Sequence, residues 1–175
     1  MSTQRLPAQI APFKLARQGQ KLQGVLGMNS MERLAEAVAE AGGDIQVDLQ
    51  FGMDEQGTYF ARGHLSANVQ MICQRCMKPL TLPIDADVTL AFISSDEGAR
   101  GLPQGYEPYI VMEEPVTLAE IVEEELILAL PIVALHDESE CEPTLEKLQA
   151  EADKTGQAGA RQNPFAVLSD LKRQK

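Results

Sequence analysis

The middle of the chain alternates hydrophobic and polar residues with a period of two. The pattern occupies residues 45–51, returns over 59–73, and continues almost without interruption over 80–92. Successive side chains of a strand point to opposite faces of a sheet, so this alternation predicts half-buried β-strands. Short polar reversals separate the three runs. The middle of the chain is therefore predicted to form an antiparallel meander, in which Pro83 bends the third strand or places it at a sheet edge.

Two other segments have helical spacing. The first begins at Asn29, which is suited to cap a helix with Glu32 three residues later, and a Gly-Gly pair ends it. The second begins at Thr117, where Glu120 completes a capping box, and it ends at Pro131. The second half of this helix is hydrophobic nearly all round, so we expect that half to be buried.

The ends of the chain have a different character. Two short hydrophobic stretches at 13–15 and 22–26 suggest an edge hairpin. Residues 142–162 are rich in Ala, Glu, Lys, Gln and Gly, as in a flexible acidic linker. Residues 163–175 begin with Asn-Pro and are predicted to form a short amphipathic helix. That helix is too short to be stable alone, so its hydrophobic side is predicted to dock on the domain or on a partner through Phe165, Leu168 and Leu171.

The predicted fold class is therefore α+β. A single domain, residues 1–141, holds an antiparallel meander in a partly closed sheet, packed by two helices. The flexible linker and the short terminal helix follow it. A chain of 175 residues is long enough for one such core and short for a second full domain.

Composition narrows the compartment and the function classes. No hydrophobic run approaches the ~18 residues of a membrane span, and the N-terminal residues do not have the hydrophobic core of a secretory signal. Three cysteines cannot all pair with one another, so thiols or metal ligands are expected in place of a disulfide framework. These features predict a cytoplasmic protein with no membrane partner.

The net charge of −11 argues against a surface that is basic throughout, but the charge is unevenly distributed. Residues 1–31 and 56–84 contain no Asp or Glu, whereas residues 113–151 contain twelve and a single Lys. If the acid-free segments share a face, Arg62, Arg75 and Lys78 would form a basic patch suited to phosphate. The alternative is that these charges are solvated and only maintain solubility.

The cysteines and one of the two histidines form a candidate metal set. Cys73 and Cys76 make a C-x-x-C placed at a predicted hairpin reversal, and His136 and Cys141 follow at H-x4-C spacing. Zinc prefers four such ligands in a tetrahedron, so a structural zinc site is predicted if the intervening chain folds back. Two alternatives stay open: buried inert thiols, and a redox dithiol, which would need a helix N-terminus after the first cysteine.

The sequence contains no persuasive catalytic constellation. The Gly-rich stretch 98–105 has neither the lysine nor the strand–helix context of a phosphate-binding loop. Three consecutive glutamates, Glu123 to Glu125, near a helix start are typical of dipole partners and solvated charge. The protein is therefore predicted not to be an enzyme, and no small-molecule substrate is expected.

Several motifs together resemble a bacterial family, the YceD or large ribosomal RNA subunit accumulation proteins. The resemblance covers nearly the whole chain in the same order and spacing. It rests on Cys73-Gln-Arg-Cys76, Tyr106-Glu-Pro108, 122–131 (Val-Glu-Glu-Glu-Leu-Ile-Leu-Ala-Leu-Pro), His136-Asp137 with Cys141, and 163–168 (Asn-Pro-Phe-Ala-Val-Leu) with Leu171-Lys172.

This resemblance implies a role in the synthesis, processing or stability of large-subunit (23S) ribosomal RNA. It also implies that the position of His136 is often another cysteine, which supports a four-ligand site. Two mechanisms fit such a role: an assembly factor that contacts a ribosomal RNA precursor, or an acidic escort for a basic large-subunit ribosomal protein that does not contact RNA. A ribonuclease would need a cluster of His, Lys and acid residues that the chain does not offer.

Overall fold

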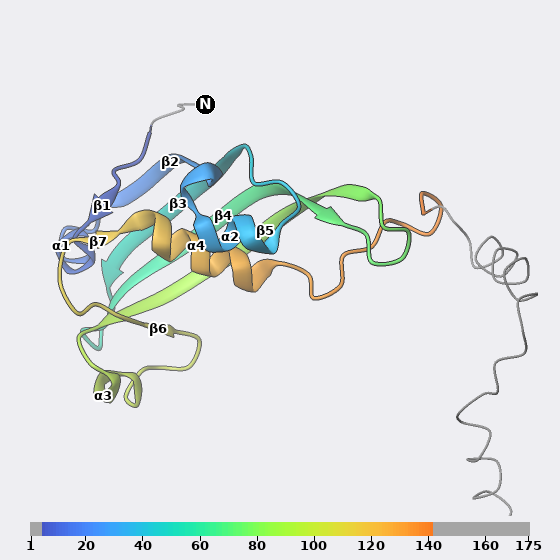
Figure 1. The fold of residues 1–175 in the computed structure, drawn as a ribbon. Coiled ribbons are helices and arrows are strands. Elements are labelled where there is room, and N and C mark those ends of the chain that lie inside the picture. Colours follow the sequence, from blue (N-terminus) through green and yellow to red (C-terminus); the bar gives the residue numbers. More distant parts are fainter. Residues whose placement is uncertain (1–4, 142–175) are drawn as a thin grey trace, which may run out of the picture. The chain divides into compact units, whose positions relative to one another are not determined.

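The computed structural model describes residues 5–141 (Figure 1). Met1–Leu135 forms one compact unit, and His136–Lys175 forms a second, which is described only as far as Cys141. The predicted linker and the predicted terminal helix with Phe165, Leu168 and Leu171 lie outside the described residues.

A five-stranded sheet dominates the fold (Figure 1). Neighbouring strands follow chain order, so the sheet is a meander, antiparallel from its first strand to its fourth. This confirms the α+β class and the period-two prediction. The strands are β2 (Lys21–Gly27), β3 (Asp44–Met53), β4 (Tyr59–Ile72), β5 (Pro79–Ile93) and β6 (Glu107–Ile110).

One face of this sheet forms the hydrophobic core. The alternating residues of β3, β4 and β5 point into it, and Phe51 stacks on Phe92 with ring centroids 5.9 Å apart. The helices cover this face, as Figure 1 shows for α2 and α4. Among the core residues that are almost completely buried are Met28, Leu34, Ile45, Leu49, Leu65 and Leu118.

The sheet is not closed, which corrects the expectation of a partly closed meander. Its edges are β2 and β6, and β6 runs parallel to β5. After β5 the chain forms the short helix α3 (Asp96–Ala99) and returns along the sheet, so β6 enters in the same direction as β5. A parallel strand at one edge needs such a crossover and could not follow from a simple hairpin.

The prediction of an N-terminal hairpin was also wrong. Residues 13–15 belong to α1 (Pro12–Arg17), and only 22–26 is a strand. Proline suits the first turn of a helix, and Pro12 and Ala16 lie on its buried side at i, i+4 spacing. The preceding residues form β1 (Gln9–Ile10), which pairs with β7 (Val116–Thr117) in a separate two-stranded sheet.

Both predicted helices exist, and Thr117 is the N-cap of the second as predicted, but neither N-cap makes a side-chain capping hydrogen bond. The first is a 3-10 turn (Met28–Ser30) followed by α2 (Glu32–Ala37), and Met31 is the N-cap. The second is α4 (Leu118–Ala129), whose N-cap Thr117 makes no side-chain cap hydrogen bond. Within residues 5–141, no helix is long and apolar enough to cross a membrane.

A carboxylate from α4 completes the start of α2. Glu123 is only 7% exposed, and its Oε1 accepts a hydrogen bond of 2.9 Å from the backbone N–H of Leu34. The first N–H groups of a helix have no partner within the helix, so this contact satisfies one of them from a distant part of the chain. Sequence analysis assigned Glu123 to solvent together with its neighbours, and the structure corrects that assignment.

The second half of α4 is only partly buried. Leu126 is fully inside, as expected, but Leu128 is 70% exposed. Within residues 5–141 the helix packs on β5 and against α2, and Leu128 lies outside these contacts on an exposed side. The prediction that this half is buried all round was therefore wrong.

Among the strands of residues 5–141, β5 has a neighbour on only one side over a long stretch. It pairs with β4 along its length, whereas β6 pairs only with Leu90 to Ile93. Pro83 lies in the stretch without a second strand, opposite Asn68, which confirms its predicted edge position. Asp85 and Asp87 follow it on the outer face of the sheet, where His64 lies 3.1 Å from a carboxylate oxygen of each.

We expect replacement of Glu123 by alanine to destabilise the protein by about 1–3 kcal/mol, because the buried Leu34 N–H would lose its acceptor. The amide oxygen of Glu123→Gln keeps an acceptor, so its loss should be smaller. The neighbouring Glu124 is exposed, and Glu124→Ala serves as the control with a change within about 0.5 kcal/mol. Urea unfolding measures all three, and equal losses for Glu123→Ala and Glu124→Ala would contradict the assignment.

The hydrogen bonds to Asp87 and Asp85 raise the pKa of His64 above its ordinary value of 6.5. A raised folded-state pKa stabilises the fold fully below the unfolded value, and this contribution is lost as the pH rises through the folded value. The free energy of unfolding of the wild-type protein should therefore exceed that of His64→Gln at about pH 5.5, and this difference should disappear by about pH 9. Because the site is exposed, the effect should be small and reduced by salt. A stability difference independent of pH would contradict it.

Candidate metal centre

The first two candidate ligands lie in the turn between β4 and β5. Cys73 directly follows β4, its N–H donates to the carbonyl of Lys78 at 2.9 Å, and its own carbonyl accepts the N–H of Met77 at 2.9 Å. Met77 has φ of 58°, a left-handed conformation that is uncommon outside glycine. These hydrogen bonds and this conformation turn the chain within a few residues and hold Cys73 and Cys76 at the same turn.

The other two ligands come from the end of the described chain. The N–H of Glu140 donates to the carbonyl of Asp137 at 3.0 Å, so the chain turns between His136 and Cys141. A turn at this point allows both side chains to face one way despite the four residues between them.

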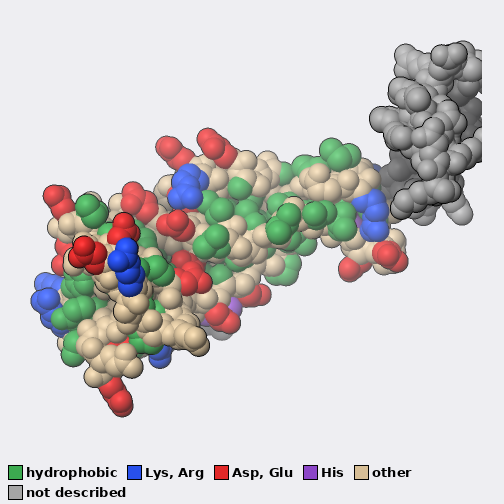
Figure 2. All heavy atoms as spheres, turned by 90° about the horizontal axis from the view of Figure 1, so that it is seen from below, with side chains coloured by type: hydrophobic (Ala, Val, Ile, Leu, Met, Phe, Trp, Pro, Cys, Tyr) green, Lys and Arg blue, Asp and Glu red, His purple; other side chains and the backbone are tan. Residues whose placement is uncertain are grey.

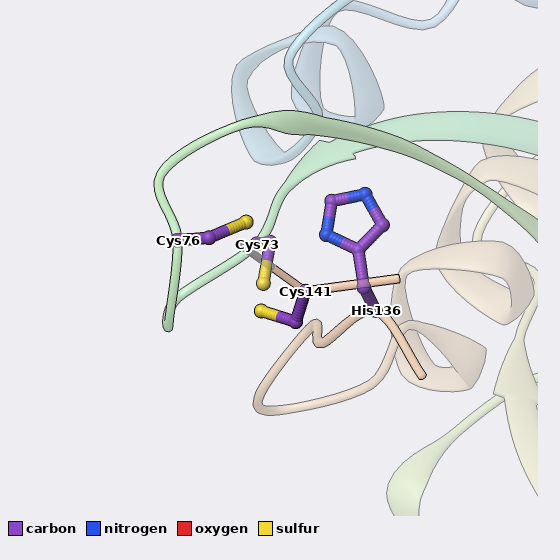
Figure 3. Close-up of side chains that lie close together, drawn as sticks. All are labelled: Cys73, Cys76, His136 and Cys141. Carbon is purple, nitrogen blue, oxygen red and sulfur yellow. The ribbon is translucent and has the colours of Figure 1, made fainter. Parts of the chain in front are cut away.

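The structure brings the four predicted ligands together. One ligand atom from each of Cys73, Cys76, His136 and Cys141 lies within 4.8 Å of all the others (Figure 3). Cys73 and Cys141 are buried, and the other two are half-buried. Among the described residues, no other group of three or more His, Cys, Asp or Glu side chains has its ligand atoms close enough to hold a metal ion.

The donor set fits a structural zinc ion. Three thiolates and one imidazole supply four ligands, the number that tetrahedral zinc requires. With Zn–S bonds of about 2.3 Å, sulfurs in a tetrahedron lie roughly 3.8 Å apart, so the observed limit of 4.8 Å needs about 1 Å of contraction. Zinc would also neutralise thiolates that otherwise repel one another in a partly buried site. If all four residues bound the ion, no position would be left open for a substrate.

The predicted phosphate-contacting residues do not form one patch. Arg75 and Lys78 are exposed in the same turn as the cysteines. Arg62 lies towards the other end of β4, where it pairs with Thr89. Ile72, at the end of β4, lies ten residues further along the strand, which corresponds to about 33 Å at 3.3 Å per residue.

Arg62 instead forms a cluster that sequence analysis did not identify. Its guanidinium carbon lies 4.7 Å from the ring centroid of Phe60 and 4.8 Å from that of Tyr106, and it donates a hydrogen bond to the Tyr106 hydroxyl. That hydroxyl contacts Asp54 at 3.2 Å. Hydrogen bonds, chiefly from the Thr58 N–H, hold the pKa of Asp54 below its ordinary value. The cluster attaches the chain before β6 to the sheet, and no sequence spacing signals it.

A further titratable group lies beside α4. Burial and, to a smaller extent, the nearby carboxylates of Glu107 and Glu124 together raise the pKa of Glu125 to about 7. Glu107 comes from β6, so the sheet topology places it against α4. The three consecutive glutamates thus differ in their exposure to solvent: Glu123 is buried, Glu124 is exposed and Glu125 is half-buried.

Comparison with known proteins identifies the group to which this chain is related. The family described as large ribosomal RNA subunit accumulation protein YceD matches residues 61–172, which include all four candidate ligands. The chain belongs to the YceD family. A YceD relative from Haemophilus influenzae, named large ribosomal RNA subunit accumulation protein, is 34% identical over 173 residues, covering 98% of this chain and 99% of its own. No solved structure matches the chain.

We expect the purified protein to contain about one zinc per chain, and Cys76→Ser to lose most of it, because three ligands bind zinc far more weakly than four. Metal analysis by mass spectrometry measures the content, and thermal unfolding should show a lower midpoint for the variant and for wild type in chelator.

Met77→Gly is the matched control, because it changes the same turn without removing a ligand. Glycine accepts a φ of 58° more readily, so this variant should keep its zinc and its stability. A melting curve of the wild-type protein that does not change in chelator would show instead that the thiols are inert.

Proposed function

We propose that this protein is a non-catalytic assembly factor that supports the synthesis, processing or stability of large-subunit (23S) ribosomal RNA. The main support is the match to a relative named for large ribosomal RNA subunit accumulation, over nearly the full length of both chains. The four-ligand cluster supports a structural role for its residues, because a zinc ion held by four protein ligands has no open position for catalysis.

In this proposal the zinc ion fixes the β4–β5 turn and thereby holds Arg75 and Lys78 in place as phosphate contacts. Both side chains are exposed, and the segment 56–84 in which they lie contains no Asp or Glu. Arg62 contributes separately, near the other end of β4. Contacts to phosphate position a protein on RNA without reading its sequence, so the proposal names ribosomal RNA as a class of partner and no particular sequence.

A second candidate function is that of an acidic escort or adaptor for a basic large-subunit ribosomal protein, without contact to RNA. The observation in its favour is the charge of α4 and its surroundings. Between Glu107 and Leu135 the chain has seven glutamates and no Lys or Arg. Such a surface attracts a basic protein and repels phosphate.

One experiment separates the two candidates. The full-length tagged protein is captured from lysate with and without ribonuclease, and the bound RNA and proteins are measured together. Loss of ribosomal proteins on digestion supports contact through RNA. Retention of a specific basic ribosomal protein after digestion supports the escort, and recovery of neither ribosomal RNA nor ribosomal protein would contradict both.

If Arg75 and Lys78 contact phosphate, the double variant Arg75→Gln/Lys78→Gln should bind large-subunit ribosomal RNA fragments more weakly. The slope of log affinity against log salt should fall by roughly 0.7–0.9 for each lost contact. Fluorescence anisotropy over a salt series measures both quantities. Arg100 is an exposed arginine outside the acid-free segments, so Arg100→Gln is the control. Identical slopes for the two variants and the wild-type protein would remove this turn from the interface.

A further inference from the structure

Hydrophobic side chains are exposed around the end of α4. Leu128 on the helix and Ile132, Val133 and Leu135 in the segment after it are each 45% exposed or more, and Ile132 is fully exposed. Figure 2 shows hydrophobic side chains on the surface of the molecule seen from below, with Asp and Glu side chains among them. Single exposed leucines are normal, but a contiguous group with a polar rim is typical of a protein-binding surface.

The same surface is acidic. Glu120, Glu124 and Leu128 follow one another at four-residue spacing on α4, so they lie along one face of the helix. Glu124 is exposed, and Glu107 of β6 acts on the half-buried Glu125 beside it. A row of carboxylates therefore leads directly to the exposed hydrophobic side chains. We call the set Glu107, Glu120, Glu124, Glu125, Leu128, Ile132 and Val133 the α4 surface.

We propose that the α4 surface binds a Lys- or Arg-rich protein segment whose hydrophobic side chains contact Leu128, Ile132 and Val133. This inference deepens the second candidate function, because it locates the surface and defines the chemistry of the partner. A cationic amphipathic helix has the matching arrangement: hydrophobic residues at three- and four-residue spacing, with cations on the adjacent sides.

Charge decides between the kinds of occupant. Nucleic acid and anionic lipid are repelled, because the carboxylates of the α4 surface have no Lys or Arg between Glu107 and Leu135 to offset them. A second copy of this chain bound through the same surface would place like charges opposite one another, which opposes association. A cationic segment meets neither obstacle.

The titration of Glu125 is consistent with a cation as the missing neighbour. Burial and the carboxylates of Glu107 and Glu124 raise its pKa to about 7, so part of the population is protonated near neutral pH. A bound ammonium or guanidinium group would favour the ionised form and relieve the repulsion among the three carboxylates. The partner thus supplies the charge that this region of the protein does not contain.

The test uses the full-length protein and a synthetic helix-forming peptide of leucine and lysine, about 18 residues long, roughly the ~27 Å needed to follow α4 and the segment after it. Binding is measured by fluorescence anisotropy. The double variant Leu128→Ser/Ile132→Ser should weaken binding by about fivefold or more, and Glu124→Gln/Glu125→Gln should weaken it and reduce its salt dependence. All substituted positions are exposed or half-buried, so the variants should remain folded.

Two controls test whether binding is specific to this surface. Met53, the last residue of β3, is 56% exposed, and Glu55 is exposed in the turn before β4, so neither belongs to the α4 surface. Met53→Ser and Glu55→Gln should leave peptide affinity unchanged. A peptide with glutamate in place of lysine should not bind. Equal losses for the control variants and the α4 variants would overturn the proposal.

Two further outcomes separate this inference from its alternatives. Concentration-dependent dimerisation that Leu128→Ser abolishes in sedimentation would assign the surface to a second copy of the chain and overturn the proposal. If the α4 variants keep their ribosomal RNA in the capture experiment but the wild-type protein does not bind the peptide, the inference fails while the proposed ribosomal function stands. Loss of protein partners alone from the α4 variants supports both.

Discussion

The pairing of β4 with β5 is the constraint on which the other features depend. Their ladder runs from Tyr59↔Phe92 to Ile72↔Pro79 without a break. One end of it supplies Phe92 to the core, where the ring stacks on Phe51. The other end delivers Cys73 and Cys76 to a turn that hydrogen bonds define. Because side chains alternate between faces along both strands, a shift of one residue would expose the core and misplace the cysteines together.

Sequence reasoning succeeded where a short-range pattern determines the structure. Alternation over 45–51 and 80–92 identified β3 and β5, and Pro83 identified an edge, because strand periodicity and the missing proline N–H are local properties. The candidate metal set was also predictable. Cysteine and histidine are rare in this chain, so their spacing stands out even across sixty residues.

The errors share a different cause, which is dependence on contacts between distant segments. A hydrophobic residue such as Phe13 fits a buried strand or a buried helix equally well. Its helix, α1, packs against β3 and β4, and these contacts between distant segments are not visible in the local sequence. Glu123 looks like its two neighbours until Leu34 from α2 presents an N–H to it. β6 is parallel to β5 because the chain passes through α3 between the two strands. The hydrophobic pattern of the sequence does not predict that path.

Charge is distributed unevenly along the chain. The β4–β5 turn presents Arg75 and Lys78 within an acid-free stretch, while α4 and β6 gather carboxylates beside exposed leucine and isoleucine side chains. The net charge of −11 describes neither region.

The edge of β5 carries a consequence for behaviour at high concentration. A long strand with backbone groups open on one side is a template on which further chains can add, and it invites sheet-to-sheet association between molecules. Pro83 interrupts that template, since it offers no N–H, and Asp85 and Asp87 place negative charge on the same stretch. These three residues make an incoming strand both poorly bonded and repelled. These features oppose the addition of another strand along this part of β5.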